Sequence, residues 1–594
     1  MSAISLSLGL AFLVVAFWPR LRRFFWTLQV PGPLLPRGIK GNLVDFMAQP
    51  RTFGPSMVAK YGPLYRVYTN NCGALLAIGD PVLAQQLYQD QANMAKPLDA
   101  GLGCYLQRFL GDAMGLASGR KWTNIRKAFR VPLSPATADA SLANIEASLD
   151  QWEEETLEPL ARSGVAVTVP EVVAMMPITV MLNIFFGHKF VRRHSAELAR
   201  LTEDADVIMK TALYNRLACT SLYRHLPTGP NRTLASFQHN WAGILQAYET
   251  SQERREGEGG AIDSVVDFMN SSQAGSITFS EVADTMSEII FTNQDVLSPA
   301  ISWLLTDLVV YPHQAQSLQL ASNSGLMDRA TLQDQQPHLL NLIKESARVH
   351  PFFPLSIPEV LSKDVQLGGF SLLAGTTVSI DQYSINMNPQ YWQEPSTFRP
   401  ERFEDSDAFR DKWSLFRFGF GARRCPGQHY GNLVLANVTA RLLARWRLVP
   451  VGMEGVTHHE LVPMVPGNFA MMPDIKVRLE DSGENKNAQQ NVAMDVFSRG
   501  KENRKMETKE LSSEVKENSK NETKDVTLEG KENSIKETKG VSPEGKEIIE
   551  RTSKNVSSEG KANNEKETSD ESSEGKDCNQ ENNNALNTPV LCEA

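Results

Sequence analysis

The hydrophobic pattern of the chain starts with an apolar run. Residues 4–18 are almost wholly apolar, and Arg20, Arg22 and Arg23 follow directly. A membrane-spanning helix needs about 20 apolar residues, and a cleaved signal peptide would carry its positive charge before such a run rather than after it. The pattern therefore predicts a signal anchor over residues 1–28, with the bulk of the chain on the cytoplasmic side. A buried or interfacial helix is the alternative.

The pattern that follows is that of a large folded body. Three prolines between residues 31 and 36 oppose both helix and central strand, so we expect a stiff, extended linker over residues 29–37. Residues 38–480 are expected to be mainly α-helical with small β-sheets. The predicted elements are a β-hairpin over residues 64–69 and 75–78, a helix from Pro81, long helices from about 135 to 350, strands over 365–380 and a helix over 433–446.

The last part of the chain, residues 481–594, differs in composition from the rest. From Arg499 onward the chain contains 17 Lys and Arg and 22 Asp and Glu, but no Phe, Tyr or Trp. Such a segment cannot build a core. Lysine recurs every 15 residues, at Lys501, Lys516, Lys531, Lys546, Lys561 and Lys576. The repeat holds too few large apolar residues for one unit to stack on the next, so we expect a disordered tail.

Charge and cysteine usage exclude several classes of protein. The formal net charge is -9, and residues 1–498 hold 43 basic against 47 acidic side chains, so neither part has the basic surplus of a nucleic-acid binder. The 6 cysteines form no CxxC pair, which argues against a disulfide scaffold or a structural zinc site. The sequence also lacks the glycine signatures of dinucleotide and phosphate loops.

A glycine-rich loop at residues 418–427 carries the most chemical information. We expect a helix to begin directly after Cys425, so that its amides and dipole favour an anionic sulfur. Gly421 and Gly427 let the backbone approach a flat cofactor closely. Arg423 supplies a cation suited to a carboxylate of that cofactor. A small buried thiol is the alternative for the cysteine.

This loop resembles the haem-binding loop of the cytochrome P450 family, FxxGxRxCxG, at every fixed position. The resemblance implies a cytochrome P450 fold for the body and a haem, protoporphyrin IX iron, as cofactor. It implies that Cys425 is the axial thiolate and metal ligand, and a catalytic residue. It further implies cofactor contacts from Phe418, Gly421, Arg423 and Gly427.

Other elements of the family follow in the expected order. Glu345 and Arg348 form an ExxR motif whose spacing places both charges on one helix face, and Arg402 lies in a PERF element. By resemblance these three residues form a buried charge triad with a structural role. Trp122 and Arg126 form a WxxxR motif, whose two donors bind a haem propionate in the family. For that pair, a surface aromatic–cation contact is the alternative.

The family's long central helix matches at residues 292–303. Asp295 occupies the position of an acid that, with a following alcohol, relays protons in a monooxygenase, so we take it as a catalytic residue. Val296 stands where the alcohol is usual. Ordered water, Ser298 or the substrate are other relays, and Pro299 is expected to kink the helix. A solvated helix acid is the alternative for Asp295.

By resemblance, the chain also has an expected pocket and expected partners. The predicted pocket residues are Thr292, Val296, Leu297, Ile357 and Phe469. They are largely apolar, which favours a small lipophilic substrate. Glu359 stands where the family often places Arg or His against a propionate, so that charge is expected to be met by Trp122, Arg126 and Arg423.

A basic proximal face and a membrane anchor imply a reductase as electron donor. Four cations are expected within one helix and three around the Cys loop; they are Lys121, Arg126, Lys127 and Arg130, and Arg417, Arg423 and Arg424. They suit an acidic surface such as that of NADPH–cytochrome P450 reductase, and a solvated basic patch is the alternative. The implied location is the endoplasmic reticulum membrane, single-pass, with the catalytic domain facing the cytoplasm.

Three functions stay open at this point. The first is a haem-thiolate monooxygenase acting on a lipophilic substrate in secondary metabolite biosynthesis. The second is a haem-thiolate isomerase, dehydratase or oxidative ring-closing enzyme, which the valine at position 296 motivates. The third is a non-catalytic haem-binding protein, against which the intact Cys425 loop argues.

Overall fold

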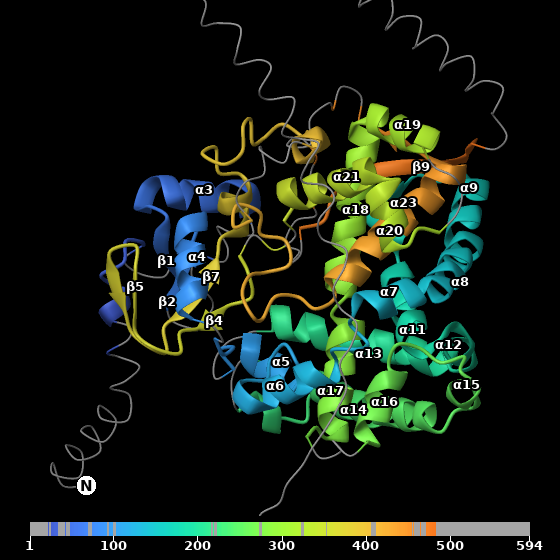
Figure 1. Ribbon diagram of the computed structural model, residues 1–594, viewed down its shortest axis with the longest axis horizontal. Coiled ribbons are helices and arrows are strands. Elements are labelled where there is room, and N and C mark those ends of the chain that lie inside the picture. Colours follow the sequence, from blue (N-terminus) through green and yellow to red (C-terminus); the bar gives the residue numbers. More distant parts are fainter. Residues whose placement is uncertain are drawn as a thin grey trace, which may run out of the picture. The chain divides into compact units, whose positions relative to one another are not determined.

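The computed structural model describes most of the body of the chain (Figure 1). The described residues are 22, 25–33, 42, 48–68, 74–91, 94–98, 102–215, 218, 222–271, 276–321, 326–351, 353, 355–404, 412–453, 456, 462, 464 and 471–482. The predicted anchor, apart from its last residues, and the tail beyond residue 482 lie outside this set. By its contacts the chain divides into Met1–Val492 and Ala493–Ala594, and all the described residues belong to the first unit.

Helices make up most of the described body, in agreement with the sequence. They are α3 (Pro50–Tyr61), α4 (Pro81–Asp90), α5 (Leu102–Leu110), α6 (Gly119–Ala128), α7 (Pro135–Ala140), α8 (Leu142–Trp152), α9 (Glu158–Ser163), α10 (Val169–Val173), α11 (Met176–Phe186), α12 (His188–Arg193), α13 (Ser195–Tyr214), α14 (Gly229–Glu249), α15 (Gln252–Arg255), α16 (Asp263–Met269), α17 (Phe279–Phe291), α18 (Gln294–Val310), α19 (Pro312–Ala321), α20 (Arg329–Asp334), α21 (Pro337–Val349), α22 (Gln382–Asn386) and α23 (Gln428–Arg445). A π turn η2 (Glu153–Leu157) and the 3₁₀ turns η4 (Tyr223–His225) and η5 (Pro400–Phe403) supplement them.

The strands form small sheets. They are β1 (Leu64–Tyr68), β2 (Ala74–Ile78), β3 (Val167–Thr168), β4 (Glu359–Val360), β5 (Val365–Leu367), β6 (Phe370–Leu372), β7 (Thr377–Ile380), β8 (Trp446–Val451) and β9 (Lys476–Asp481). Among the described residues, one sheet has the order β1-β2-β7-β4, a second the order β3-β9-β8, and β5 pairs with β6. The predicted hairpin is present, with Leu64 opposite Ile78, and β2 runs parallel to β7.

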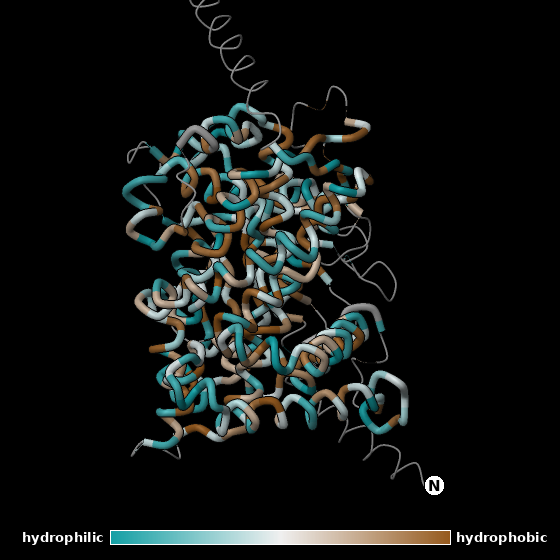
Figure 2. Tube along the Cα trace, turned by 90° about the vertical axis from the view of Figure 1, so that its right-hand side faces the viewer, coloured by the Kyte–Doolittle hydropathy of each residue, from teal (hydrophilic) through white to brown (hydrophobic). Residues whose placement is uncertain are grey.

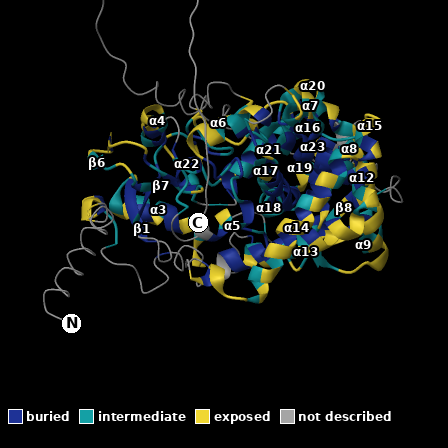
Figure 3. Cartoon of the chain, turned by 90° about the horizontal axis from the view of Figure 1, so that it is seen from below, coloured by how far each residue is buried: buried dark blue, intermediate teal, exposed yellow. Residues whose placement is uncertain are grey.

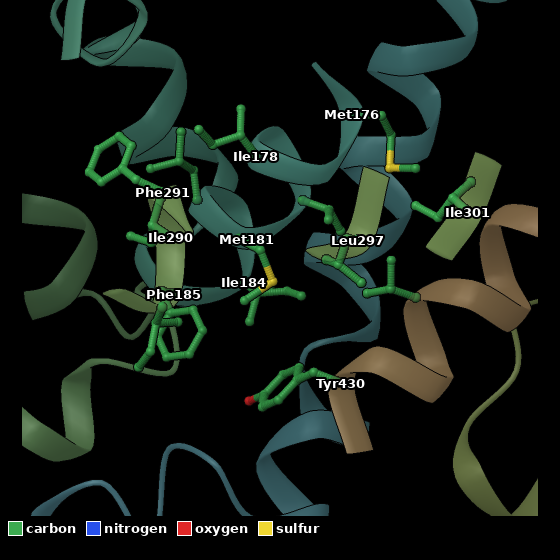
Figure 4. Close-up of a cluster of buried hydrophobic side chains, with 14 of the residues drawn as sticks. Met176, Ile178, Met181, Ile184, Phe185, Ile290, Phe291, Leu297, Ile301 and Tyr430 are labelled. Atoms are coloured by element: carbon green, nitrogen blue, oxygen red, sulfur yellow. The ribbon is translucent and has the colours of Figure 1, made fainter. Parts of the chain in front are cut away.

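Helices α11 and α18 lie in the main core. Side chains from both gather there with Tyr430 of α23 (Figure 4). Hydrophobic segments recur throughout the body (Figure 2), and α18 is coloured as buried where α9 and α14 show exposed residues (Figure 3). Val169–Phe186 is the one described stretch long and apolar enough to cross a membrane, and 72% of it is buried inside the body. We therefore assign it to the core.

The segment that precedes α3 is fastened to β1. Arg66 is buried, and its guanidinium donates to the carbonyl oxygens of Val30 and Pro33, each at 2.8 Å, and of Thr27 at 3.0 Å. A Cβ at Gly32 would lie 2.4 Å from the carbonyl oxygen of Arg66, so only glycine fits there. Residues 29–33, the described part of the extended spacer expected over residues 29–37, are therefore held against β1 by Arg66.

Candidate active site

The Cys425 loop is closed by a backbone hydrogen bond. The N–H of Cys425 donates to the carbonyl oxygen of Phe418 at 2.7 Å. Gly421 has a φ of +69°, and a Cβ there would lie 2.8 Å from the Tyr88 ring. A helix start at Pro426, which the sequence predicted, is wrong by two residues: α23 begins at Gln428, because residues 426 and 427 still belong to the turn.

The Cys425 thiol is solvent-accessible but surrounded by protein. Desolvation raises the pKa of this thiol, and the charge of Glu288 raises it further. Two effects lower the pKa: the hydrogen bond from the Gly427 N–H to the sulfur and the charge of Arg126. An accessible sulfur with a hydrogen-bond donor and a cation beside it is a suitable ligand for a metal, because a metal would keep the thiolate deprotonated.

The three residues expected to bind propionates lie together beside this loop. The guanidinium carbon of Arg423 lies 5.3 Å from the Trp122 ring centroid. Arg126 donates to the carbonyl oxygen of Arg424 at 3.2 Å. Burial lowers the pKa of Arg126 and of Arg423, and the charge of Arg126 lowers that of Arg423 further. Two desolvated guanidiniums of like charge favour an anionic ligand between or beside them.

A buried ion pair that the sequence did not predict lies close to Arg423. Lys96 donates to Glu359 at 3.1 Å, and the Tyr88 hydroxyl donates to the same carboxylate at 2.9 Å. Desolvation lowers the pKa of Lys96, although Glu359 opposes this shift. Glu359 also raises the pKa of Arg423 electrostatically. The carboxylate at position 359 therefore comes with its own cation, and only tertiary structure could reveal the partner, 263 residues away.

The central helix is interrupted at the acid motif. Thr292 and Asn293 separate α17 from α18, and their side chains donate to the carbonyl oxygens of Glu288 and Ile289. In an unbroken helix those carbonyls would accept from the N–H groups of residues 292 and 293. The expectation of one long helix is therefore corrected to two. Pro299, where a kink was predicted, lies inside α18.

Asp295 faces α13. Burial raises its pKa to about 6, Asp206 adds to the rise and Lys210 opposes it. The two α13 residues form an exposed i,i+4 ion pair at 2.7 Å. Asp295 is thus a half-buried acid with charged surface residues on one side, an arrangement that suits proton exchange with solvent.

The predicted pocket residues differ widely in how far their side chains are exposed. Thr292 and Val296 are half-buried and Leu297 is 5% exposed in the core. Ile357 is 67% exposed. Phe469 lies outside the described residues.

The predicted charge triad is an interlocked ion cluster. Glu345 and Arg348 are fully buried and Arg402 nearly so. Glu345 accepts two hydrogen bonds from Arg348, both at 2.8 Å, and one from Arg402 at 3.0 Å. The N–H of Arg399 adds a fourth at 2.8 Å. The two guanidiniums also donate to backbone carbonyls, including that of Thr397. The cluster joins α21 to the segment that carries η5.

The predicted proximal cations do not all form one surface. Arg130 lies beyond the end of α6, and Lys121 is paired with Asp112 at 2.6 Å. Arg417 is half-buried over the Phe418 ring, and desolvation lowers its pKa to about 10. Lys127, Arg130 and Arg424 remain exposed.

Comparison with known proteins identifies the family. The family model described as Cytochrome P450 matches residues 31–471. The chain belongs to the cytochrome P450 family. As a cytochrome P450 it is a haem-associated oxidoreductase of the monooxygenase type, which the sequence predicted.

Individual relatives of this cytochrome P450 are distant. It is 25% identical to "Cytochrome P450 monooxygenase asaD" of Aspergillus flavus over 75% of the chain and 84% of the relative. The identity is also 25% to "Cytochrome P450 monooxygenase aclC" of Aspergillus oryzae, over 66% of the chain and 79% of the relative. The identity to "Cytochrome P450 71D18" of Mentha gracilis is 28%, over 67% of the chain and 82% of the relative.

The residues around Cys425 fit the haem that the family implies. An accessible thiol with a sulfur-directed N–H suits an iron ligand. The neighbouring Arg126 and Arg423, of like charge, suit a cofactor that carries carboxylates. The thiol and the cations thus match the two chemical features that a haem presents.

Proposed function

We propose that this cytochrome P450 inserts one atom of dioxygen into a lipophilic organic substrate, with electrons from NADPH delivered by NADPH–cytochrome P450 reductase. The observation that carries the proposal is the accessible Cys425 thiol near the charge of Arg126, in a loop whose Arg423 lies over the Trp122 ring. A haem bound through a thiolate supplies dioxygen activation, since donation from the sulfur favours O–O cleavage.

The roles of the residues follow from their contacts. Cys425 would hold the iron, and Trp122, Arg126 and Arg423 would bind propionates. Gly421 and Gly427, with Phe418, would shape the loop under the cofactor. Asp295 would pass protons from the α13 side, where Asp206 and Lys210 lie near it. The Glu345 cluster would keep the scaffold in place without touching the reaction.

We place the protein at the endoplasmic reticulum membrane, single-pass and with its catalytic body in the cytoplasm. The apolar residues 4–18 and the arginines after them support this placement. The exposed cations Lys127, Arg130 and Arg424 are a suitable docking surface for an acidic reductase. We further propose a role in secondary metabolite biosynthesis; the two Aspergillus relatives, named as cytochrome P450 monooxygenases, support the monooxygenase activity.

A second function has one specific observation in its favour. Val296 at the alcohol position favours an isomerase, dehydratase or ring-closing reaction that needs no proton relay. A peroxide substrate would then react without reductase or NADPH. A non-catalytic haem protein would show neither activity.

The test uses the full chain in microsomes. Reduction under carbon monoxide should give the red-shifted Soret band of a haem thiolate. NADPH and oxygen consumption should then depend on added reductase and on a lipophilic substrate. A chain without the band would contradict the haem-thiolate proposal. Turnover of a peroxide without reductase would favour the second function.

The alcohol position offers a prediction about coupling. Val296→Thr places a hydroxyl beside Asp295, so we expect the peroxide released per NADPH oxidised to fall by about tenfold, since a positioned proton donor contributes at least this much. Product and peroxide are measured together with NADPH at several pH values.

The control for this prediction carries Asp295→Asn as well as Val296→Thr. Because the pKa of Asp295 is raised to about 6, its carboxyl loses its proton as the pH rises through that value. The gain in coupling should therefore decline between pH 6 and 8 in the single variant. It should be absent at every pH in the double variant. A gain that survives in the double variant would remove Asp295 from the relay.

A further inference from the structure

The segment between α5 and α6 forms a strap over α17. The strap comprises residues 111–117, and three of its N–H groups point at α17. That of Asp112 donates to Asp284 at 2.9 Å, and that of Gly115 donates to Glu288 at 2.8 Å. The N–H of Met114 donates to the Thr285 hydroxyl at 3.2 Å between them. Side chains on successive turns of one helix therefore anchor one edge of the strap.

Glycine allows the strap to approach each carboxylate closely. Gly111 has a φ of +49°, and a Cβ there would lie 2.1 Å from an oxygen of Asp284. A Cβ at Gly115 would lie 1.7 Å from an oxygen of Glu288. The two carboxylates thus occupy the space that any side chain at these positions would need.

The other edge of the strap is bound to the Cys425 loop. Arg423 donates to the carbonyl oxygens of Gly115 at 3.0 Å and of Ala117 at 2.9 Å. Gly115 therefore gives its N–H to Glu288 and its carbonyl to Arg423, which lies two residues before Cys425. This connection of α17 to the cofactor loop runs through one glycine.

The Glu288 carboxylate also interacts electrostatically with residues of the candidate active site. Burial raises its pKa, while Arg423 and Lys96 lower it, and its charge acts on the Cys425 thiol. Asp284, one turn earlier on α17, has the same kind of contact with the strap but its charged neighbours are Asp112, Glu281 and Lys121. The two carboxylates differ in whether their strap residue touches Arg423.

We propose that Glu288 is a positioning residue which, through Gly115, holds Arg423 and the Cys425 loop in place at the edge of the haem. The proposal rests on the proposed function, because Cys425 must be the ligand of that haem. It assigns a role to an acid outside the acid motif at Asp295.

The test compares three variants of the full chain: Glu288→Ala, Glu288→Gln and Asp284→Ala. The readouts are the rate at which haem transfers to excess apomyoglobin and the amide exchange of the 111–117 peptide. Glu288→Ala should release haem roughly tenfold faster or more, the usual size of a supporting-residue effect. Glu288→Gln should stay within about twofold of wild type, because its amide oxygen still accepts the Gly115 N–H.

Asp284→Ala is the matched control. It should speed amide exchange in the strap but leave haem release near the wild-type rate. The proposal is overturned if Glu288→Ala releases haem at the wild-type rate, or if Asp284→Ala accelerates release equally. A wild-type protein without the haem-thiolate band would instead overturn the proposed function together with this role.

Discussion

Cys425→Ser is expected to abolish the red-shifted carbon monoxide band and reductase-dependent turnover. A serine hydroxyl at this place is a much weaker donor to iron than a thiolate. Changes to residues that merely support a metal ligand cost about 10–100-fold in affinity or activity, so loss of the ligand should cost at least that. The band is measured on reduced microsomes, with turnover followed as substrate-dependent NADPH consumption.

Cys578→Ser is the control, because this cysteine lies beyond the region that matches the family. It should keep both the band and turnover. A Cys425→Ser variant with an unchanged band would show that another group holds the iron. Retention of the band with loss of turnover in Cys578→Ser would point to a role for the tail in catalysis.

Glu345→Ala should strongly destabilise the body. It leaves Arg348 and Arg402 buried without the carboxylate that accepts from both. Breaking a buried ion pair from one side costs about 3–5 kcal/mol, which is a large part of the stability of an ordinary domain. The variant should unfold at a much lower urea concentration, followed by circular dichroism and by loss of haem absorbance.

An exposed pair provides the comparison for this change. Glu258 pairs with Lys189 on the surface, so Glu258→Ala should change the free energy of unfolding by no more than about 1 kcal/mol. Glu345→Gln keeps a side-chain oxygen and should fall between the two. Overlapping unfolding curves for Glu345→Ala and Glu258→Ala would contradict a structural role for the cluster.

Local signals in the sequence predicted much of the fold. Alternation and turn residues predicted the β1–β2 hairpin, and Asp80 before Pro81 predicted the start of α4, where Asp80 caps the helix by accepting from the Leu83 N–H. These features depend on residues close together in the chain. The spacing of Glu345 and Arg348 predicted their pairing for the same reason.

Other features depend on contacts that sequence patterns do not show. At the break between α17 and α18, Thr292 and Asn293 bond to carbonyls of the preceding turn, and a helical pattern does not reveal where such a break falls. From the sequence alone, Glu359 is an acid where the family often has Arg or His; the structure shows that Lys96 pairs with it. The strap contacts of Glu288 and Arg423 likewise join segments far apart in the chain.

The hydrogen bonds of Arg66 determine how residues 27–33 are oriented relative to the folded body. Arg66 holds the carbonyl oxygens of Thr27, Val30 and Pro33 against β1. A flexible tether would let the catalytic body tumble freely about its attachment point. Because these hydrogen bonds hold residues 27–33 against β1, a force applied to the chain ahead of Thr27 is transmitted to the sheet and is not absorbed by a flexible segment. Arg66 therefore fixes the direction in which the chain enters the folded body at residues 27–33.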